Sequence, residues 1–92
     1  MTILTVEAKT LEVADVRCTD ADLVITLRDG RKLTAPLWWY PRLQRATAAQ
    51  RSRWELAGAG RGIHWPEIDE DISLEGLLRG AKDPRATPPA DA

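Results

Sequence analysis

Apolar and polar residues alternate on both sides of a central Asp29-Gly30 pair, and this pattern constrains the fold more than any other feature. Every second residue is apolar, and these residues are Leu23, Ile25, Leu27, Leu33, Ala35 and Leu37. A period of two places such side chains on one face of paired strands. Asp-Gly also suits the left-handed backbone of a two-residue type I′ turn. The segment therefore predicts an antiparallel hairpin on a core, ending or running along a sheet edge at Pro36.

The residues before the hairpin predict a further strand. Thr5–Val16 is rich in β-formers but alternates poorly, whereas Val16 and Cys18 flank Arg17 in the manner of a strand end. Residues 19–22 (Thr-Asp-Ala-Asp) then predict a turn.

Short helices are predicted after the hairpin. Proline suits the first turn of a helix over Pro41–Ala46. Thr47 and Gln50 match a capping box, which predicts a second helix over Ala48–Trp54. A last helix over Leu74–Arg79 is expected, capped by Asp71 or Ser73 and ended by Gly80.

Glycines at positions 58, 60 and 62 predict a turn between two short strands, Glu55–Ala57 and Ile63–Trp65. Pro66 is expected to end the second strand. The whole pattern predicts an α+β fold, with a small antiparallel sheet of three or more strands and two or three short helices packed on it. Ninety-two residues make one domain. We expect a lead-in over residues 1–10, the domain over 11–80 and a flexible Pro-rich tail over 81–92.

Composition excludes several classes of protein. Thirteen basic and fourteen acidic residues argue against general coating of nucleic acid, which needs a basic excess. A lone cysteine, Cys18, forms no internal disulfide or cysteine-based zinc site, and we interpret it as a small core residue. The sequence shows no signal-peptide pattern and no apolar run near the roughly 20 residues of a membrane span. We expect a cytoplasmic protein without membrane association.

The sequence gives little support for catalysis or for a metal site. His64 would need a carboxylate from Asp69 or Asp71 and a hydroxyl from Ser52 or Ser73, but no nucleophile motif is present. We interpret His64 as structural, bonded to backbone, and the chain as non-enzymatic. The acids at positions 67 and 69–71 lack the spacing of a calcium loop, and acids at a helix N-terminus explain 69–71 without an ion. No metal or cofactor is expected.

Aromatic rings and charge suggest binding instead. If Trp38 and Trp39 lie in a strand, they point to opposite faces, so one is a candidate for contact with a partner. Residues 40–61 hold five arginines against one glutamate, and residues 67–75 hold five acids and no base. Either these two segments partly complement each other across the fold or simply face water, or they form a dipolar surface that steers a charged partner.

Five motifs together resemble the bacterial domain-of-unknown-function family DUF2442 over Leu11–Gly80. They are Asp29-Gly30-Arg31, Leu37-Trp38-Trp39-Tyr40-Pro41-Arg42-Leu43, Ala46-Thr47 through Trp54-Glu55-Leu56, Gly62-Ile63-His64-Trp65-Pro66-Glu67-Ile68-Asp69-Glu70-Asp71-Ile72 and Leu77-Leu78. The resemblance implies a small α+β domain without catalytic residues. Some members carry an added C-terminal helix-turn-helix, and others neighbour a small toxin and are thought to be its antitoxin. Only the Pro-rich tail follows Gly80 here, so direct DNA reading is not favoured.

We therefore expect a non-catalytic protein-interaction module, antitoxin-like or a regulator of a small neighbouring-gene protein. The expected partner-binding residues are Trp38, Tyr40 and Arg42 on one edge and Glu67, Asp69 and Glu70 on another. The alternative is a nucleic-acid-binding transcriptional regulator that uses the arginine-rich helical segment, with Arg42, Arg45, Arg51 and Arg53. Assembly into a homo-oligomer is left open.

Overall fold

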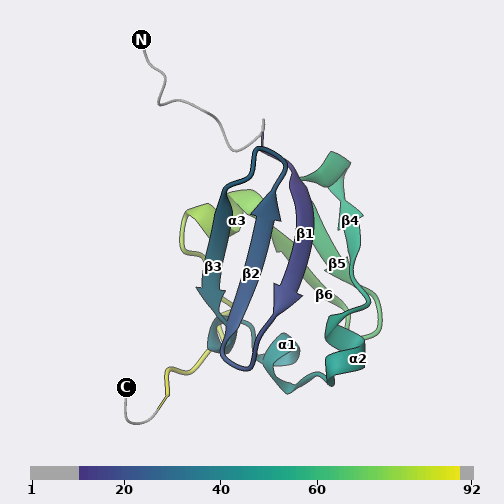
Figure 1. Ribbon diagram of the computed structural model, residues 1–92. Coiled ribbons are helices and arrows are strands. Elements are labelled where there is room, and N and C mark those ends of the chain that lie inside the picture. Colours follow the sequence, from purple (N-terminus) through teal and green to yellow (C-terminus); the bar gives the residue numbers. More distant parts are fainter. Residues whose placement is uncertain (1–10, 90–92) are drawn as a thin grey trace.

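The computed structural model describes residues 11–89, in which two three-stranded antiparallel sheets face each other (Figure 1). The first sheet has the order β1 (Val13–Cys18), β2 (Asp22–Leu27), β3 (Lys32–Pro36). The second has the order β4 (Glu55–Ala57), β5 (Gly62–Trp65), β6 (Glu70–Ser73). The predicted α+β class and antiparallel pairing are confirmed, although the strands form two sheets instead of one. The predicted lead-in, residues 1–10, lies outside the described residues.

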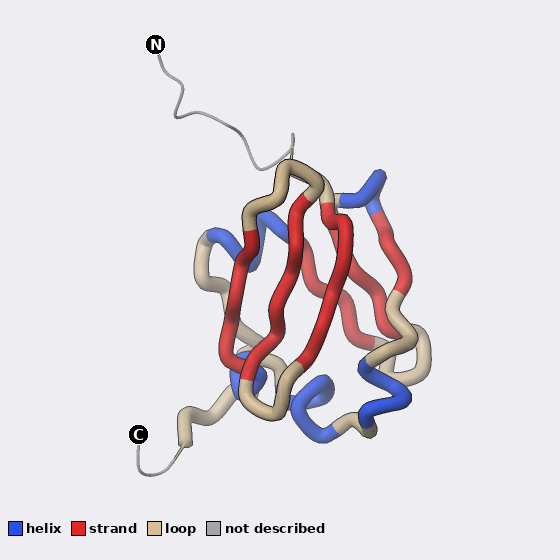
Figure 2. Tube along the Cα trace, in the orientation of Figure 1, coloured by secondary structure: helices blue, strands red, loops and turns tan. Residues whose placement is uncertain are grey.

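Short helices lie in the connection between β3 and β4, in the turn after β4 and after the last strand β6, and helices α1 and α2 lie together at one end of the two sheets (Figure 2). They are the α-helices α1 (Pro41–Arg45), α2 (Ala48–Arg51) and α3 (Leu74–Leu78) and the 3-10 turns η3 (Leu37–Trp39) and η4 (Gly58–Gly60). None of the helices within residues 11–89 has the length and apolarity that crossing a bilayer requires.

The predicted hairpin is confirmed, but its predicted type I′ turn is wrong. The Leu27 amide donates to the Arg31 carbonyl at 2.8 Å, and the Gly30 amide donates to the Leu27 carbonyl at 2.9 Å. Only Gly30 in this loop has a positive φ, 96°, so the loop has three residues and closes with a glycine bulge. Asp29 stays out of the left-handed region, and its carboxylate accepts hydrogen bonds from the Arg31 amide and guanidinium instead.

The core lies between the two sheets. The predicted apolar face is buried at Leu23, Ile25 and Leu27, each at most 2% exposed, whereas Leu33 on the edge strand β3 is half-buried. Leu37 is also buried, but it lies in the turn η3 and not in strand β3. The second sheet contributes the fully buried side chains Ile63 and Trp65. Cys18 is half-buried against this core, and burial raises the pKa of its thiol.

The helix starts follow their capping residues. Helix α1 begins at Pro41, as predicted. The capping box of Thr47 and Gln50 is present in full, but α2 ends at Arg51 and not near Trp54. The Ser52 hydroxyl bonds the Ala49 carbonyl at 2.8 Å and closes the single turn, since serine competes for backbone groups. Ser73, and not Asp71, caps α3 by accepting a hydrogen bond from the Gly76 amide.

The glycine-rich turn between β4 and β5 is confirmed, but the acidic run does not begin a helix. Glu70–Ser73 forms strand β6, with Glu70 and Ile72 facing inward and Asp71 and Ser73 facing outward. Pairing with β5 gives these residues the two-residue period of a strand. The prediction that the acids lie at a helix N-terminus is therefore wrong. Gly76 has no room for a side chain, because an added Cβ would lie 2.9 Å from the capping hydroxyl of Ser73.

Candidate functional site

Two rows of side chains cross the outer face of the second sheet. Residues paired across antiparallel strands share a face, so the register gives the rows Glu55–His64–Asp71 and Ala57–Gly62–Ser73. The end residues of both rows are exposed, and the central His64 and Gly62 are half-buried. This face therefore brings the sole histidine and part of the acidic run to the surface.

His64 is paired with Asp71, one of the two carboxylates that the sequence offered. Their Nδ1 and Oδ1 atoms lie 2.8 Å apart, so the expected bond to backbone is replaced by a side-chain bond between cross-strand neighbours. The Ser73 hydroxyl accepts a hydrogen bond from the Gly76 amide, and the Ser52 hydroxyl donates one to the Ala49 carbonyl. Neither candidate hydroxyl is hydrogen-bonded to His64 in the described chain, and the His64–Asp71 pair, called the clamp below, links β5 to β6.

A hollow of about 710 Å³ lies on the second sheet beside this clamp. Gly62 is one of the residues that line the hollow, and a Cβ added there would meet only ordinary contacts of 3.6–3.8 Å. Its polar lining comes from Arg61, Asp71, Ser73 and Glu75, and the carboxylate-bearing side chains of Asp71 and Glu75 are each 72% exposed. The hollow is thus open to solvent and bordered by two acids.

Strand β4 forms an edge of the second sheet next to this hollow. It pairs only with β5 among the described strands, and all three of its residues are exposed. Leu56 pairs with Ile63 and so lies on the inner face, yet it remains 49% exposed. In Figure 1 the edge strands β1 and β4 lie on the same side of the molecule, where the two sheets end. The apolar interior is therefore incompletely covered at β4.

A second, smaller cavity of about 330 Å³ is lined by polar residues from three parts of the chain. Tyr40 and Glu70 are 5% and 7% exposed, and the Tyr40 hydroxyl is buried with no hydrogen-bond partner in the described chain. Burial, helped by the charge of Glu70, raises the pKa of Tyr40 to about 12. Burial also raises the pKa of Glu70, as does the negative charge of Asp83, while Arg42 opposes both.

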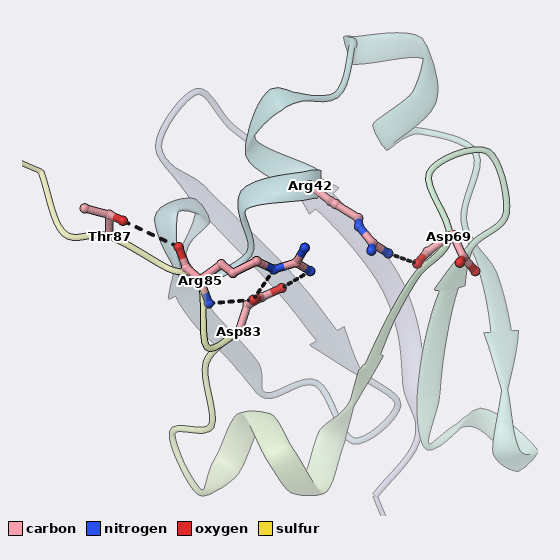
Figure 3. A network of polar contacts seen from close by, with 5 residues as sticks. All are labelled: Arg42, Asp69, Asp83, Arg85 and Thr87. Atoms are coloured by element: carbon pink, nitrogen blue, oxygen red, sulfur yellow. Dashed lines mark hydrogen bonds and ion pairs between the residues drawn. The ribbon is translucent and has the colours of Figure 1, made fainter.

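The two predicted groups of partner-binding residues meet in space. The Arg42 guanidinium donates to the Asp69 carbonyl at 2.6 Å (Figure 3), and Tyr40 and Glu70 line the same cavity. Tyr40 and Glu70 are buried, so neither offers a broad surface to a partner. Glu67 forms an ion pair with Arg53. One ion pair thus joins the two oppositely charged segments in the described chain, which agrees with the interpretation that they partly complement each other across the fold.

The predicted geometry of the adjacent tryptophans is wrong. Trp38 and Trp39 lie in the 3-10 turn η3, and both are half-buried instead of facing opposite sides of a strand. The Lys82 ammonium lies 5.0 Å from the centre of the Trp39 ring and 6.0 Å from that of Trp38. Both rings therefore have an intramolecular neighbour already.

The arginines of the helical segment are mostly bound within the protein. Arg51 donates to the carbonyls of Leu43 and Gln44 at 3.0 and 2.7 Å, while Arg42 and Arg53 bind Asp69 and Glu67 as described. Only Arg45 is an exposed arginine of this set without a contact among the described residues. These arginines chiefly fasten loops to one another.

Sequence reasoning missed the contacts made by the first residues of the predicted tail. The Asp83 amide donates to the Trp39 carbonyl at 3.0 Å, and the Asp83 side chain is 13% exposed. Its carboxylate accepts from the Arg85 amide and guanidinium (Figure 3). An Asp-Pro dipeptide favours turn initiation, and this signal at Asp83-Pro84 pointed to an ordered turn.

Comparison with known proteins finds a family and solved structures whose descriptions name no activity. A family profile described as "Protein of unknown function (DUF2442)" matches residues 13–83. A crystal structure of a protein of unknown function from Rhodospirillum rubrum is 29% identical, with a TM-score of 0.69, covering 83% of this chain and 94% of that one. A solution structure of an uncharacterised protein from Chromobacterium violaceum is 26% identical, with a TM-score of 0.66, covering 80% and 70%. No curated protein matches.

Proposed function

Because the chain belongs to the DUF2442 family, whose description names no activity, we propose from its surface that it is a non-catalytic protein-interaction module. It binds an extended segment of a partner protein along the edge strand β4. The observation that carries this proposal is the exposed edge of β4, with Leu56 49% exposed beside a hollow bordered by acids.

An added strand has the right geometry for both features. Unpaired backbone groups on a sheet edge bind an extended chain, and pockets for alternate side chains give selectivity. Successive residues of such a chain would point alternately to the Leu56 side and to the hollow side of β4, because side chains alternate along a strand. The partner segment therefore carries an apolar residue over Leu56 and a basic neighbour on the outer face, where Glu55 of β4 is the adjacent acid.

The arrangement of charges supports a protein partner over nucleic acid. Three of the four arginines that would contact phosphates bind carbonyls or a carboxylate of this chain. A phosphate-binding surface needs its cations available to replace counterions. The expectation that the partner is a small toxin from a neighbouring gene, and that both act in the cytoplasm, is retained as part of this proposal.

The test is a pair of exposed leucine substitutions in the full chain. The partner is first isolated from the native host with the tagged chain, and the purified pair is then measured by titration calorimetry. Leu56→Lys should weaken binding at least tenfold, because it charges the apolar edge. Leu78→Lys is the matched control, since Leu78 is 47% exposed but lies on α3, and it should leave affinity unchanged.

The opposite results are equally clear. Equal affinities of the Leu56→Lys variant and the unmodified chain would place the interface elsewhere. Self-association abolished by Leu56→Lys would identify a second copy as the occupant of the edge. Tight binding of duplex DNA that falls steeply with salt and is weakened by Arg45→Ala would establish the nucleic-acid alternative instead.

A further inference from the structure

The cavity lined by Tyr40 and Glu70 has one buried polar atom that the fold leaves unpaired, the Tyr40 hydroxyl oxygen, which has no hydrogen-bond partner in the described chain. Glu70 is 7% exposed, and no hydrogen bond or ion pair reaches its carboxylate within residues 11–89. Buried polar groups in native proteins are nearly always hydrogen-bonded, and an exception needs an explanation. Both groups border one cavity of about 330 Å³, which is large enough for a small ligand group.

The cations around this cavity already have partners. Arg42 points at the Asp69 carbonyl, as Figure 3 shows, and Arg85 in the same view binds Asp83. Lys82 lies over the two tryptophan rings. Glu70 is therefore the cavity-lining carboxylate that lacks a bonded cation among the described residues, because Asp71 binds His64.

We propose that this cavity binds a protonated primary amine, with the ammonium group donating to the Glu70 carboxylate and to the Tyr40 phenol oxygen. A primary ammonium has three donors and no acceptor, so it can satisfy both oxygens at once. An anion would approach a carboxylate that has no directly bonded cation among the described residues and is disfavoured. The amine belongs either to a free small molecule or to a lysine side chain of a partner protein. The cavity and the β4 edge are lined by different side chains apart from β6, so this inference stands independently of the proposed edge binding.

The probe for the test is n-butylammonium, titrated into the uniformly labelled full chain and followed by two-dimensional NMR at constant ionic strength and pH 7.5. Saturable shifts are expected at the amides of Tyr40, Glu70 and Asp83. Sodium butyrate and n-butanol have the same carbon skeleton without the positive charge, and they should produce no saturable shift. A blocked lysine (both backbone ends capped) is the second ligand, and tighter binding of it than of butylammonium would identify a partner's lysine as the source.

Two cavity variants and one matched carboxylate variant decide the outcome. Glu70→Gln should weaken butylammonium binding at least tenfold, and Tyr40→Phe, which removes only the hydroxyl, should weaken it about threefold. Glu12→Gln makes the same chemical change on an exposed side chain outside this cavity and should leave affinity unchanged. Binding that does not saturate, or that Glu70→Gln and Glu12→Gln reduce equally, would overturn the proposal and leave a cavity filled by water only. Urea unfolding of each variant confirms that it is folded before titration.

Discussion

Replacing Trp65 by alanine tests the account of the core most directly. Its side chain is 0% exposed, and its indole nitrogen donates to the Arg51 carbonyl at 3.0 Å. Buried aromatic side chains of this size remove roughly 150–250 Å² from water. At about 25 cal/mol per Å² this is about 4–6 kcal/mol, and measured Trp→Ala changes in cores lie at about 3–5 kcal/mol. We therefore expect the free energy of unfolding to fall by about 3–5 kcal/mol.

A loss of this size is a large fraction of the total stability. A chain of 92 residues has about 5–14 kcal/mol in all, so the melting temperature should fall by roughly 12–40 °C. Urea unfolding followed by far-UV circular dichroism measures the change, with the slope against urea as a check on two-state behaviour. Trp54→Ala is the control, since Trp54 is only half-buried against the core and its loss should be clearly smaller. A Trp65→Ala loss below about 1.5 kcal/mol with an unchanged slope would refute the assignment of Trp65 to the core.

Three further outcomes are expected. Since the pKa of Glu70 is raised in the folded state, this group's stabilising contribution is complete below the unfolded value and is lost as pH rises through the folded one. The Glu70→Gln variant should thus gain stability relative to the unmodified chain between pH 4 and pH 7 in urea unfolding, and a constant difference would contradict this. Thr47→Ala should lower the unfolding free energy by about 1 kcal/mol in the same assay, because it removes the capping box of α2; Thr87→Ala, in the tail, should have no effect. Deleting residues 86–92 should leave the melting temperature unchanged, whereas deleting residues 83–92 should lower it by several degrees in a thermal scan, because Asp83 bonds the Trp39 carbonyl; equal melting temperatures would show that this contact adds nothing.

The hairpin and the acidic run differ in how well their local sequence patterns predict the structure that they adopt. The β2–β3 hairpin has alternation on both strands and a turn dipeptide, so its existence follows from neighbouring residues alone. The acidic run has both helix-start and strand features within a few residues. Pairing with β5 decides for the strand, and that pairing depends on residues that the local pattern does not include.

The turn at Asp29-Gly30 marks the same limit at smaller scale. The dipeptide correctly predicted a reversal of the chain, but the hydrogen bonds that Arg31 donates to the Asp29 carboxylate favoured a three-residue loop over the two-residue one. The prediction that Tyr40 and Glu70 contact a partner has a similar weakness, because both residues are polar and yet buried. Polar character predicts exposure only on average, and packing around a particular residue can override it.

The sequence by itself determined the elements whose signals are short-range: the hairpin, the Thr47 cap, the glycine turn and the stop at Pro66. Such signals act through bonds and backbone preferences within a few residues, so they can be read without knowing the fold. Only the tertiary structure decided the stacking of two sheets, the His64–Asp71 clamp and the cavity between Tyr40, Glu70 and Asp83. These features join residues distant in the chain, and their energies come from burial and register that exist only once the two sheets have packed together.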